Sequence, residues 1–251
     1  MNKLSFWESL PFFIVPGALM AAGFYWVMPA LEKWGVNLYI SYSLALGLPL
    51  LLMLIASMVF IAIEGVGFTW PEIKQRFRLY PIKGRDWLWV GGVFIAEMAL
   101  YLLVSRLTQR LISSGWIRLP EMIPAFVDPR TVFGQEALDQ AAGGLAGNWP
   151  VLIVSMILLV INVLGEELWW RGMILPRQEL ALGAAAWVVH GLMWNFFHAY
   201  KYWDLISLLP LSLGLSFVVS KLRNTSAGIL IHFITNGSGL IPIILGVLGQ
   251  Q

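Results

Sequence analysis

The 251-residue sequence contains no cysteine, and this absence excludes disulfide bonds, thiolate catalysis and cysteine-ligated metals. Charge is also scarce, because Asp, Glu, Lys and Arg together make up only 12% of the residues. A formal net charge of +2 is too small to indicate a nucleic-acid partner. The sequence has no internal repeat, which removes one of the signs of a secondary transporter.

Apolar residues dominate what is there. They make up 59% of the chain, and the mean hydropathy is +0.76. These values are typical of a protein that lies in a bilayer, and lipid is therefore the first expected partner. A helix needs about 20 apolar residues to cross a hydrocarbon core of roughly 30 Å. We predict a single membrane domain over residues 1–251, divided into N-terminal helices and loops (1–148) and a part that carries the functional motifs (149–251).

Apolar runs bounded by charged residues or by Gly and Pro predict an all-α, polytopic bundle of about seven to eight transmembrane helices. Seven segments can be placed, at about residues 11–31, 38–63, 87–104, 149–179, 184–203, 204–222 and 226–249. The last contains Gly237, Gly239 and Pro242, so a break is expected there. The fourth is too long for one perpendicular span, and it must tilt or extend into water.

Two connections are informative. Residues 65–86 carry five basic side chains, and such loops stay on the cytoplasmic side. If each predicted helix crosses the membrane once, successive loops lie on alternate sides. The N-terminus then lies in the cytoplasm, together with ten of the 16 basic residues. The expected location is a prokaryotic cell membrane. Residues 105–148 are longer than a simple connector, and either a short interfacial helix or a lid would explain their length.

Several ionisable or amide side chains lie in the predicted membrane helices, where a charged group costs several kcal/mol and usually marks a function. All three histidines of the protein are among them. The full set is Glu97, Glu166, Glu167, Arg171, His190, His198, His232 and Asn236. Because three separate helices supply such groups at comparable depths, we predict a shared site.

Helical spacing pairs some of these groups. Glu167 and Arg171 are four residues apart and can form an ion pair, which is also their purely structural interpretation. Glu166 points about 100° away around the helix and is free for chemistry. His232 with Asn236, and Trp194 with His198, have the same spacing of four. By depth alone, His198 lies about 18 Å and His232 about 9 Å from the cytoplasmic end of their helices, so the two can meet only if the helices tilt.

A carboxylate, two imidazoles and an amide can activate water and stabilise an oxyanion, which together would hydrolyse an amide bond. Glutamate with two histidines is also a catalytic zinc set, although the H-E-x-x-H spacing is absent. A serine nucleophile is disfavoured, because Ser212, Ser216 and Ser238 fit as small residues at helix contacts or a break.

The three motifs together resemble one known family. Glu166-Glu167-x-x-x-Arg171, Trp194-x-x-x-His198 and His232-x-x-x-Asn236, in that order, are similar to the motifs of the glutamate intramembrane proteases, the CAAX-protease and bacteriocin-processing (CPBP or Abi) family that includes type II CAAX prenyl endopeptidases. The likeness covers roughly residues 150–240. Trp194 departs from the pattern, because the family usually has Phe at this position.

The resemblance implies a role for each matched residue. Glu166 would be the general base, His198 would hold or polarise the water, and His232 and Asn236 would stabilise the oxyanion. Glu167 and Arg171 would orient the first carboxylate. The implied fold is a helical bundle with a cavity that faces the cytoplasm and that lipid-embedded substrates also reach laterally. Glu97 and His190 match no motif, and we expect Glu97 to be a hydrogen-bonding partner of Arg171 or His190.

The predicted function is that of an intramembrane endopeptidase that cleaves a lipidated or membrane-anchored peptide or protein with no cofactor and no metal. A prenylated CAAX peptide, a bacteriocin or pheromone precursor and a C-terminal sorting tail all fit such a site. A zinc-dependent intramembrane hydrolase, a proton-coupled transporter or scaffold, and a catalytically idle relative remain the alternatives. Aromatic residues near the site fit a substrate groove or an interfacial belt equally well: Trp169, Trp170, Trp187, Trp194, Phe196, Phe197, Tyr200, Tyr202 and Trp203.

Overall fold

The computed structural model describes residues 2–130 and 134–250. Within these residues the fold is all-α, 79% helical and without strands, as the sequence predicts. Its α-helices are α1 (Phe6–Ala22), α2 (Met28–Lys33), α3 (Leu38–Ile63), α4 (Trp70–Arg76), α5 (Asp86–Ser113), α6 (Gln135–Ala142), α7 (Trp149–Glu167), α8 (Leu175–Leu182), α9 (Ala186–Phe197), α10 (Leu205–Leu222), α11 (Thr225–Gly237) and α12 (Leu240–Val247). Short π and 3₁₀ turns join several of them, so that Trp149–Leu222 is helical almost throughout.

Each of the seven predicted segments falls on a helix or on a pair of consecutive helices. By length and composition, 4 helical stretches of the described chain can cross a membrane, or up to 5 if a bent pair counts as one span. That bent pair is α11 and α12, which meet at 46°, so the predicted break in the last segment is confirmed. The number of seven to eight crossings stays a prediction.

The helix predicted at residues 87–104 is longer than expected. Helix α5 continues to Ser113 instead of ending near residue 104. The charges at Arg106 and Arg110 suggested an end, but arginine favours helices, and the next glycine after them is Gly115. The following connection contains α6, a short helix that packs against α3 and α12.

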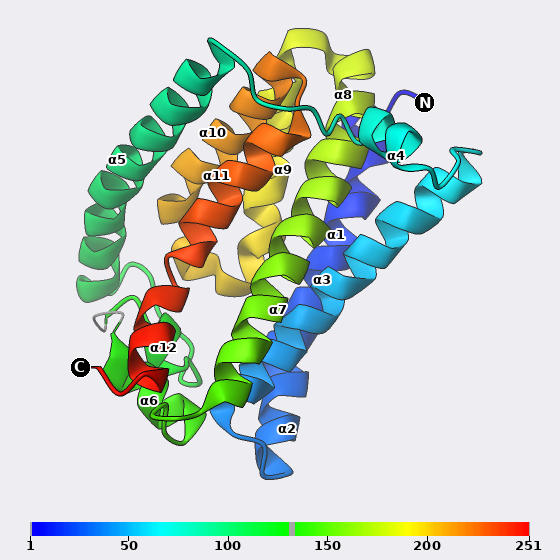
Figure 1. Cartoon of the computed structure of the whole chain (residues 1–251). Helices are drawn as coiled ribbons and strands as arrows, with labels where there is room; N and C mark the ends of the chain where they lie inside the picture. Colours follow the sequence, from blue (N-terminus) through cyan, green and yellow to red (C-terminus); the bar gives the residue numbers. More distant parts are fainter. Residues whose placement is uncertain (1, 131–133, 251) are drawn as a thin grey trace.

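Figure 1 shows how the bundle is arranged around α7. Helix α7 packs against α3 on one side and α11 on the other, whereas α5 stands at the edge and packs mainly against α10. The approach of α3 to α7 is close because Gly165 lies on the contact, where an added Cβ atom would be 2.5 Å from the carbonyl oxygen of Leu50.

Replacing Gly165 by alanine is therefore expected to destabilise the protein by about 1–3 kcal/mol, because α3 would have to move away. The matched control is Gly91→Ala in α5, where an added Cβ meets nothing within 4 Å. Thermal unfolding in detergent micelles measures both variants. Equal melting temperatures for the two would contradict the close contact.

The segments that the sequence puts in the cytoplasm lie together at one end of the bundle (Figure 1). The N-terminal Leu4 donates a backbone hydrogen bond to Arg177 in α8. Arg76 and Arg177 both pair with Glu64, which follows α3. Burial raises the pKa of Glu64, but the two guanidinium groups outweigh burial and hold that pKa below its usual range. The connection 64–85 is thereby fastened to α8.

Candidate functional site in a cavity of the bundle

Glu166 is held at its position by two hydrogen bonds. Its carboxylate accepts from the indole Nε1 of Trp194 at 2.7 Å and from the amide of Asn162 at 2.9 Å. The side chain is 3% exposed. Trp194 lies in α9 and Asn162 one turn earlier in α7, so the carboxylate is fixed from two helices. A carboxylate accepts up to about four hydrogen bonds, so both oxygens can still accept a proton from water.

A chain of amide and imidazole groups continues from Asn162. The Asn236 amide donates to Asn162 Oδ1 at 2.6 Å and to His232 Nε2 at 2.9 Å. His232 Nδ1 lies 2.9 Å from Glu167 Oε1. Because a carboxylate only accepts, Nδ1 carries the proton and Nε2 is left as the acceptor for Asn236. Helices α7 and α11 are thus joined by one continuous network.

The adjacent carboxylate, Glu167, forms an ion pair with a buried cation. Arg171 pairs with Glu167 at 2.9 Å, and both side chains are 0% exposed. The guanidinium also lies 3.9 Å from the centroid of the Trp194 ring, a cation–π distance. Arg171 belongs to the π-helical turn Leu168–Ile174, directly after α7. The ion pair predicted from the spacing of four is therefore present, and Trp194 connects it to Glu166.

His198 lies at the end of α9 with one nitrogen free for a ligand. Its Nδ1 is 3.0 Å from the carbonyl oxygen of Trp194, which can only accept, so Nδ1 is protonated and Nε2 has a lone pair. The Trp194 ring centroid is 5.2 Å from that of His198 and 5.9 Å from that of His232. The large indole therefore spans the difference in depth between the two histidines.

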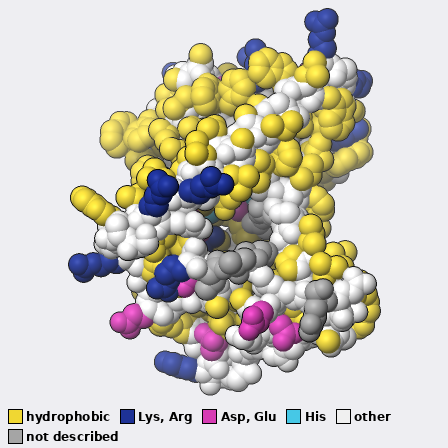
Figure 2. All heavy atoms as spheres, turned by 90° about the vertical axis from the view of Figure 1, so that its left-hand side faces the viewer, with side chains coloured by type: hydrophobic (Ala, Val, Ile, Leu, Met, Phe, Trp, Pro, Cys, Tyr) yellow, Lys and Arg dark blue, Asp and Glu magenta, His cyan; other side chains and the backbone are white. Residues whose placement is uncertain are grey.

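These groups line one wall of a cavity of about 1690 Å³. Glu166, Trp194, His198, His232 and Asn236 all border it. Leucines of α3, α7 and α10 form much of the remaining wall, and the inner face of α5 closes one side. Figure 2 shows the molecule from the side of α5, with a hollow at mid-height and both basic and acidic side chains near it.

The cavity lies away from the end of the bundle where the basic connection 64–85 lies. Its lining comes from the second half of α5, residues 115–130, α12 and the part of α3 nearest its N-terminus, and includes no residue of 64–85. A cavity that faces the cytoplasm and a cytoplasmic N-terminus were both expected. Both stay predictions. The N-terminus lies at the end of the bundle near α8 and the connection 64–85, whereas the residues that line the cavity lie nearer α12.

Residues 148–238 match a family model described as type II CAAX prenyl endopeptidase Rce1-like. The matched segment contains all three motifs and is similar to that family. The resemblance inferred from the three motifs is thereby confirmed, and the family indicates a membrane protease. No curated protein and no solved structure matches the chain.

The Rce1-like segment brings together all seven residues that its motifs single out. Glu166, Glu167, Arg171, Trp194, His232 and Asn236 share one hydrogen-bond and ring-contact network, and His198 joins it through Trp194. Among the described residues, no group of three or more His, Asp or Glu side chains is arranged to hold a metal ion.

Other polar residues of the sequence lie outside this network. His190 is fully buried and bonds Gln178. Glu97 is 2% exposed, and neither of its oxygens has a hydrogen-bond partner among the described residues, so the expected bond to Arg171 or His190 is not found. Ser216 and Ser238 donate to backbone carbonyls, and Ser212 donates to Asn195.

Part of the aromatic cluster belongs neither to a groove nor to a belt. Trp170 and Trp203 are 0% exposed, and Trp169 donates to the backbone of Phe12, so all three belong to the core. Of the nine aromatic residues, only Trp194 and Tyr200 line the cavity. The core interpretation was missed because apolar runs alone do not distinguish a lipid-facing position from a buried one.

Asn162 is the site residue that sequence reasoning missed. It bridges Glu166 and Asn236, although it belongs to none of the three motifs. The available signal was an amide inside an apolar helix, four residues before Glu166.

Proposed function

We propose that the chain is an intramembrane endopeptidase that hydrolyses a peptide bond of a membrane-associated or prenylated substrate by means of a glutamate-activated water. The observation that supports this most directly is the position of Glu166. It is a buried carboxylate at the wall of the cavity, aligned by Trp194 and Asn162. Its neighbours His198, His232 and Asn236 line the same cavity.

In the proposed reaction, Glu166 takes a proton from water while the oxygen attacks the carbonyl carbon of the scissile bond. His198 Nε2, which has a free lone pair, accepts the second hydrogen of that water and so orients it. Glu166 then returns its proton to the nitrogen of the leaving amine as the C–N bond breaks. The products are a carboxylic acid and an amine, which ionise to a carboxylate and an ammonium group.

The negative oxygen that forms on the attacked carbonyl needs hydrogen-bond donors. Asn236 supplies an amide at the cavity wall, but both of its N–H groups already donate, to Asn162 and to His232. Oxyanion stabilisation therefore requires the substrate oxygen to replace one of these acceptors. Glu167 keeps the proton on His232 Nδ1 and thereby fixes the orientation of the imidazole.

The first test is cleavage of a peptide panel by the purified chain in lipid vesicles, with and without a strong chelator. The panel contains farnesylated peptides, the same peptides without the farnesyl group, and peptides with one membrane helix. We expect chelator-resistant cleavage of at least one lipidated or membrane-anchored peptide. Cleavage that a chelator stops and zinc restores would instead indicate the zinc hydrolase. A folded chain that cleaves nothing in the panel would contradict the proposal and favour a transporter, a scaffold or an idle relative.

Replacing Trp194 by phenylalanine tests the alignment of Glu166. The phenyl ring retains the packing against Arg171 and both histidines but removes the indole donor to Glu166. A hydrogen bond to a charged group contributes about 1.5–3 kcal/mol, so the rate is expected to fall at least about tenfold. The control is Trp187→Phe on the same helix, whose ring packs against Phe217. An unchanged rate in Trp194→Phe would show that the indole N–H is dispensable.

A further inference from the structure

The mouth of the cavity is positively charged. Arg106 and Arg110 project from the last turns of α5, and Arg118 follows in the next connection; all three line the cavity and none forms an ion pair among the described residues. Arg130 also lines it but is paired with Asp128 at 2.6 Å. In Figure 2 basic side chains lie above and to the left of the hollow, and acidic side chains lie below it. Three unpaired guanidinium groups create a positive potential that attracts anions to the mouth.

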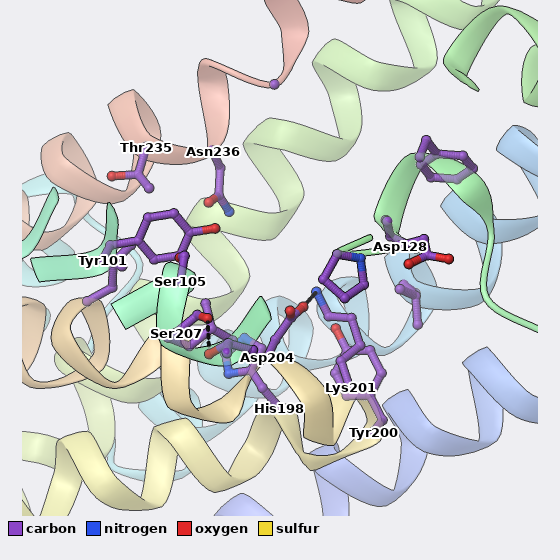
Figure 3. A pocket seen from close by; sticks show the side chains of 18 of the residues that line it. Tyr101, Ser105, Asp128, His198, Tyr200, Lys201, Asp204, Ser207, Thr235 and Asn236 are labelled. Carbon is purple, nitrogen blue, oxygen red and sulfur yellow. Dashed lines mark hydrogen bonds and ion pairs between the residues drawn. The ribbon is translucent and has the colours of Figure 1, made fainter. Parts of the chain in front are cut away.

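Lys201 lies further inside, next to the candidate catalytic residues. It follows His198 by three residues, in the 3₁₀ turn His198–Asp204, and it lines the cavity. The backbone kinks at Lys201, where φ is −115° and ψ is 57°. Figure 3 shows its ammonium group in the cavity, directed toward Asp204. The side chain is 19% exposed, so the charge is largely removed from water.

The only acidic partner of Lys201 in the described chain is Asp204, at 3.8 Å. This distance is too long for a hydrogen bond, and an ammonium group has three N–H donors to satisfy. Leu208 and Leu211 belong to the same wall of the cavity. A cation that is partly desolvated and loosely paired gains most from a second anion.

The separation of Lys201 from the site fits a short peptide. Three residues of a 3₁₀ turn rise about 6 Å, and an extended peptide spans about 3.3–3.6 Å per residue. A peptide whose carbonyl carbon lies beside Glu166 and His198 therefore brings its C-terminal carboxylate to Lys201 after roughly two to four residues, once the reach of the lysine side chain is included. A carboxylate at this depth needs a cation.

We propose that Lys201 binds the free C-terminal carboxylate of the substrate, and that Arg106, Arg110 and Arg118 steer this carboxylate into the cavity. The inference rests on the proposed endopeptidase function and adds a specificity-determining residue to it. The enzyme would then distinguish a substrate that ends shortly after the scissile bond from one that continues.

The test uses two fluorescent farnesylated peptides that differ only at the C-terminus, one with a free carboxylate and one with an amide. Binding is measured with full-length Glu166→Gln in phosphatidylcholine vesicles, and cleavage is measured in parallel with the native chain. We expect the carboxylate peptide to bind about tenfold more tightly, since one partly exposed ion pair distinguishes the two peptides. Adding Lys201→Met should abolish that preference, whereas Lys201→Arg should retain most of it. Lys221→Met, which removes a lysine that packs on Trp89, should leave the preference unchanged.

Equal binding of the two peptides would overturn the proposal, and if the native chain still cleaves both, the proposed endopeptidase function stands. A Lys201-dependent preference without cleavage would support the carboxylate site and contradict the function. A phospholipid phosphate is the other anion available to Lys201, and vesicles that contain phosphatidylglycerol test it. Lys201-dependent binding of that lipid, with no difference between the peptides, would assign the site to headgroups and overturn the proposal.

Discussion

Replacing Glu166 by glutamine is expected to lower the rate of peptide hydrolysis by about 10²–10⁴-fold, the usual contribution of a general base. Glutamine has nearly the same shape and can still accept from the Trp194 indole, but it cannot take a proton from water. In the native chain the Asn162 amide donates to Glu166, so in the variant the NH₂ group of the glutamine would face another hydrogen-bond donor. Asn162 cannot reverse its amide without losing the bond from Asn236. A small additional loss of stability is therefore expected, and the rate should be measured at a temperature well below unfolding.

The chain offers a matched control for this variant in Glu97, the other isolated carboxylate inside a membrane helix. Glu97 is 2% exposed and does not border the cavity. Glu97→Gln should therefore cleave the same peptide within a few-fold of the native rate. If Glu166→Gln were as active as Glu97→Gln, water would have to be activated by a different group, and the proposed mechanism would be wrong.

The helices and the close pairs of this site could be predicted from the sequence because both depend on local patterns. Apolar runs are long enough to show each helical segment, and residues four apart on one helix must be neighbours. The ion pair of Glu167 with Arg171 and the hydrogen bond of Asn236 to His232 follow from that spacing alone. The family match likewise depends on the order of the motifs along the chain.

Contacts between helices could not be predicted in this way, because they depend on how each helix is rotated and tilted. The bond from Trp194 to Glu166 joins residues 28 positions apart. The bond from Asn236 to Asn162 joins residues 74 positions apart. The spacing of Trp194 and His198 predicts only that these two residues are neighbours, whereas the structure places the indole in contact with Glu166, Arg171 and both site histidines.

The direction of the cavity was also beyond the sequence. Basic residues predict which loops share a side of the membrane, and the structure does gather the N-terminus, α4 and α8 at one end. They do not predict where the helices diverge. That depends on α5, which packs mainly against α10 and leaves a gap toward α12. The length of α5, extended by two turns of charged and polar residues, brings Arg106 and Arg110 to the mouth of this gap.

Replacing Arg171 by methionine is expected to destabilise the protein by about 3–5 kcal/mol, the cost of leaving one partner of a buried ion pair uncompensated. Glu167 is 0% exposed, and without the guanidinium its carboxylate would keep only the bond to His232. The Trp194 ring would also lose the cation stacked on it, and the alignment of Glu166 would loosen as a result. Denaturant unfolding in micelles measures the stability, and peptide cleavage well below the unfolding transition measures the site.

Two further variants separate a lost ion pair from a general effect of removing an arginine. Arg85→Met changes an exposed arginine at the start of α5 and should alter the stability by no more than about 0.5 kcal/mol. The double variant Glu167→Gln with Arg171→Met removes both charges, and replacing a buried pair by neutral groups is often close to neutral. We therefore expect the double variant to be more stable than Arg171→Met alone. A double variant that is no more stable than the single one would mean that the loss comes from the packing of Arg171 on Trp194, and not from the charge left on Glu167.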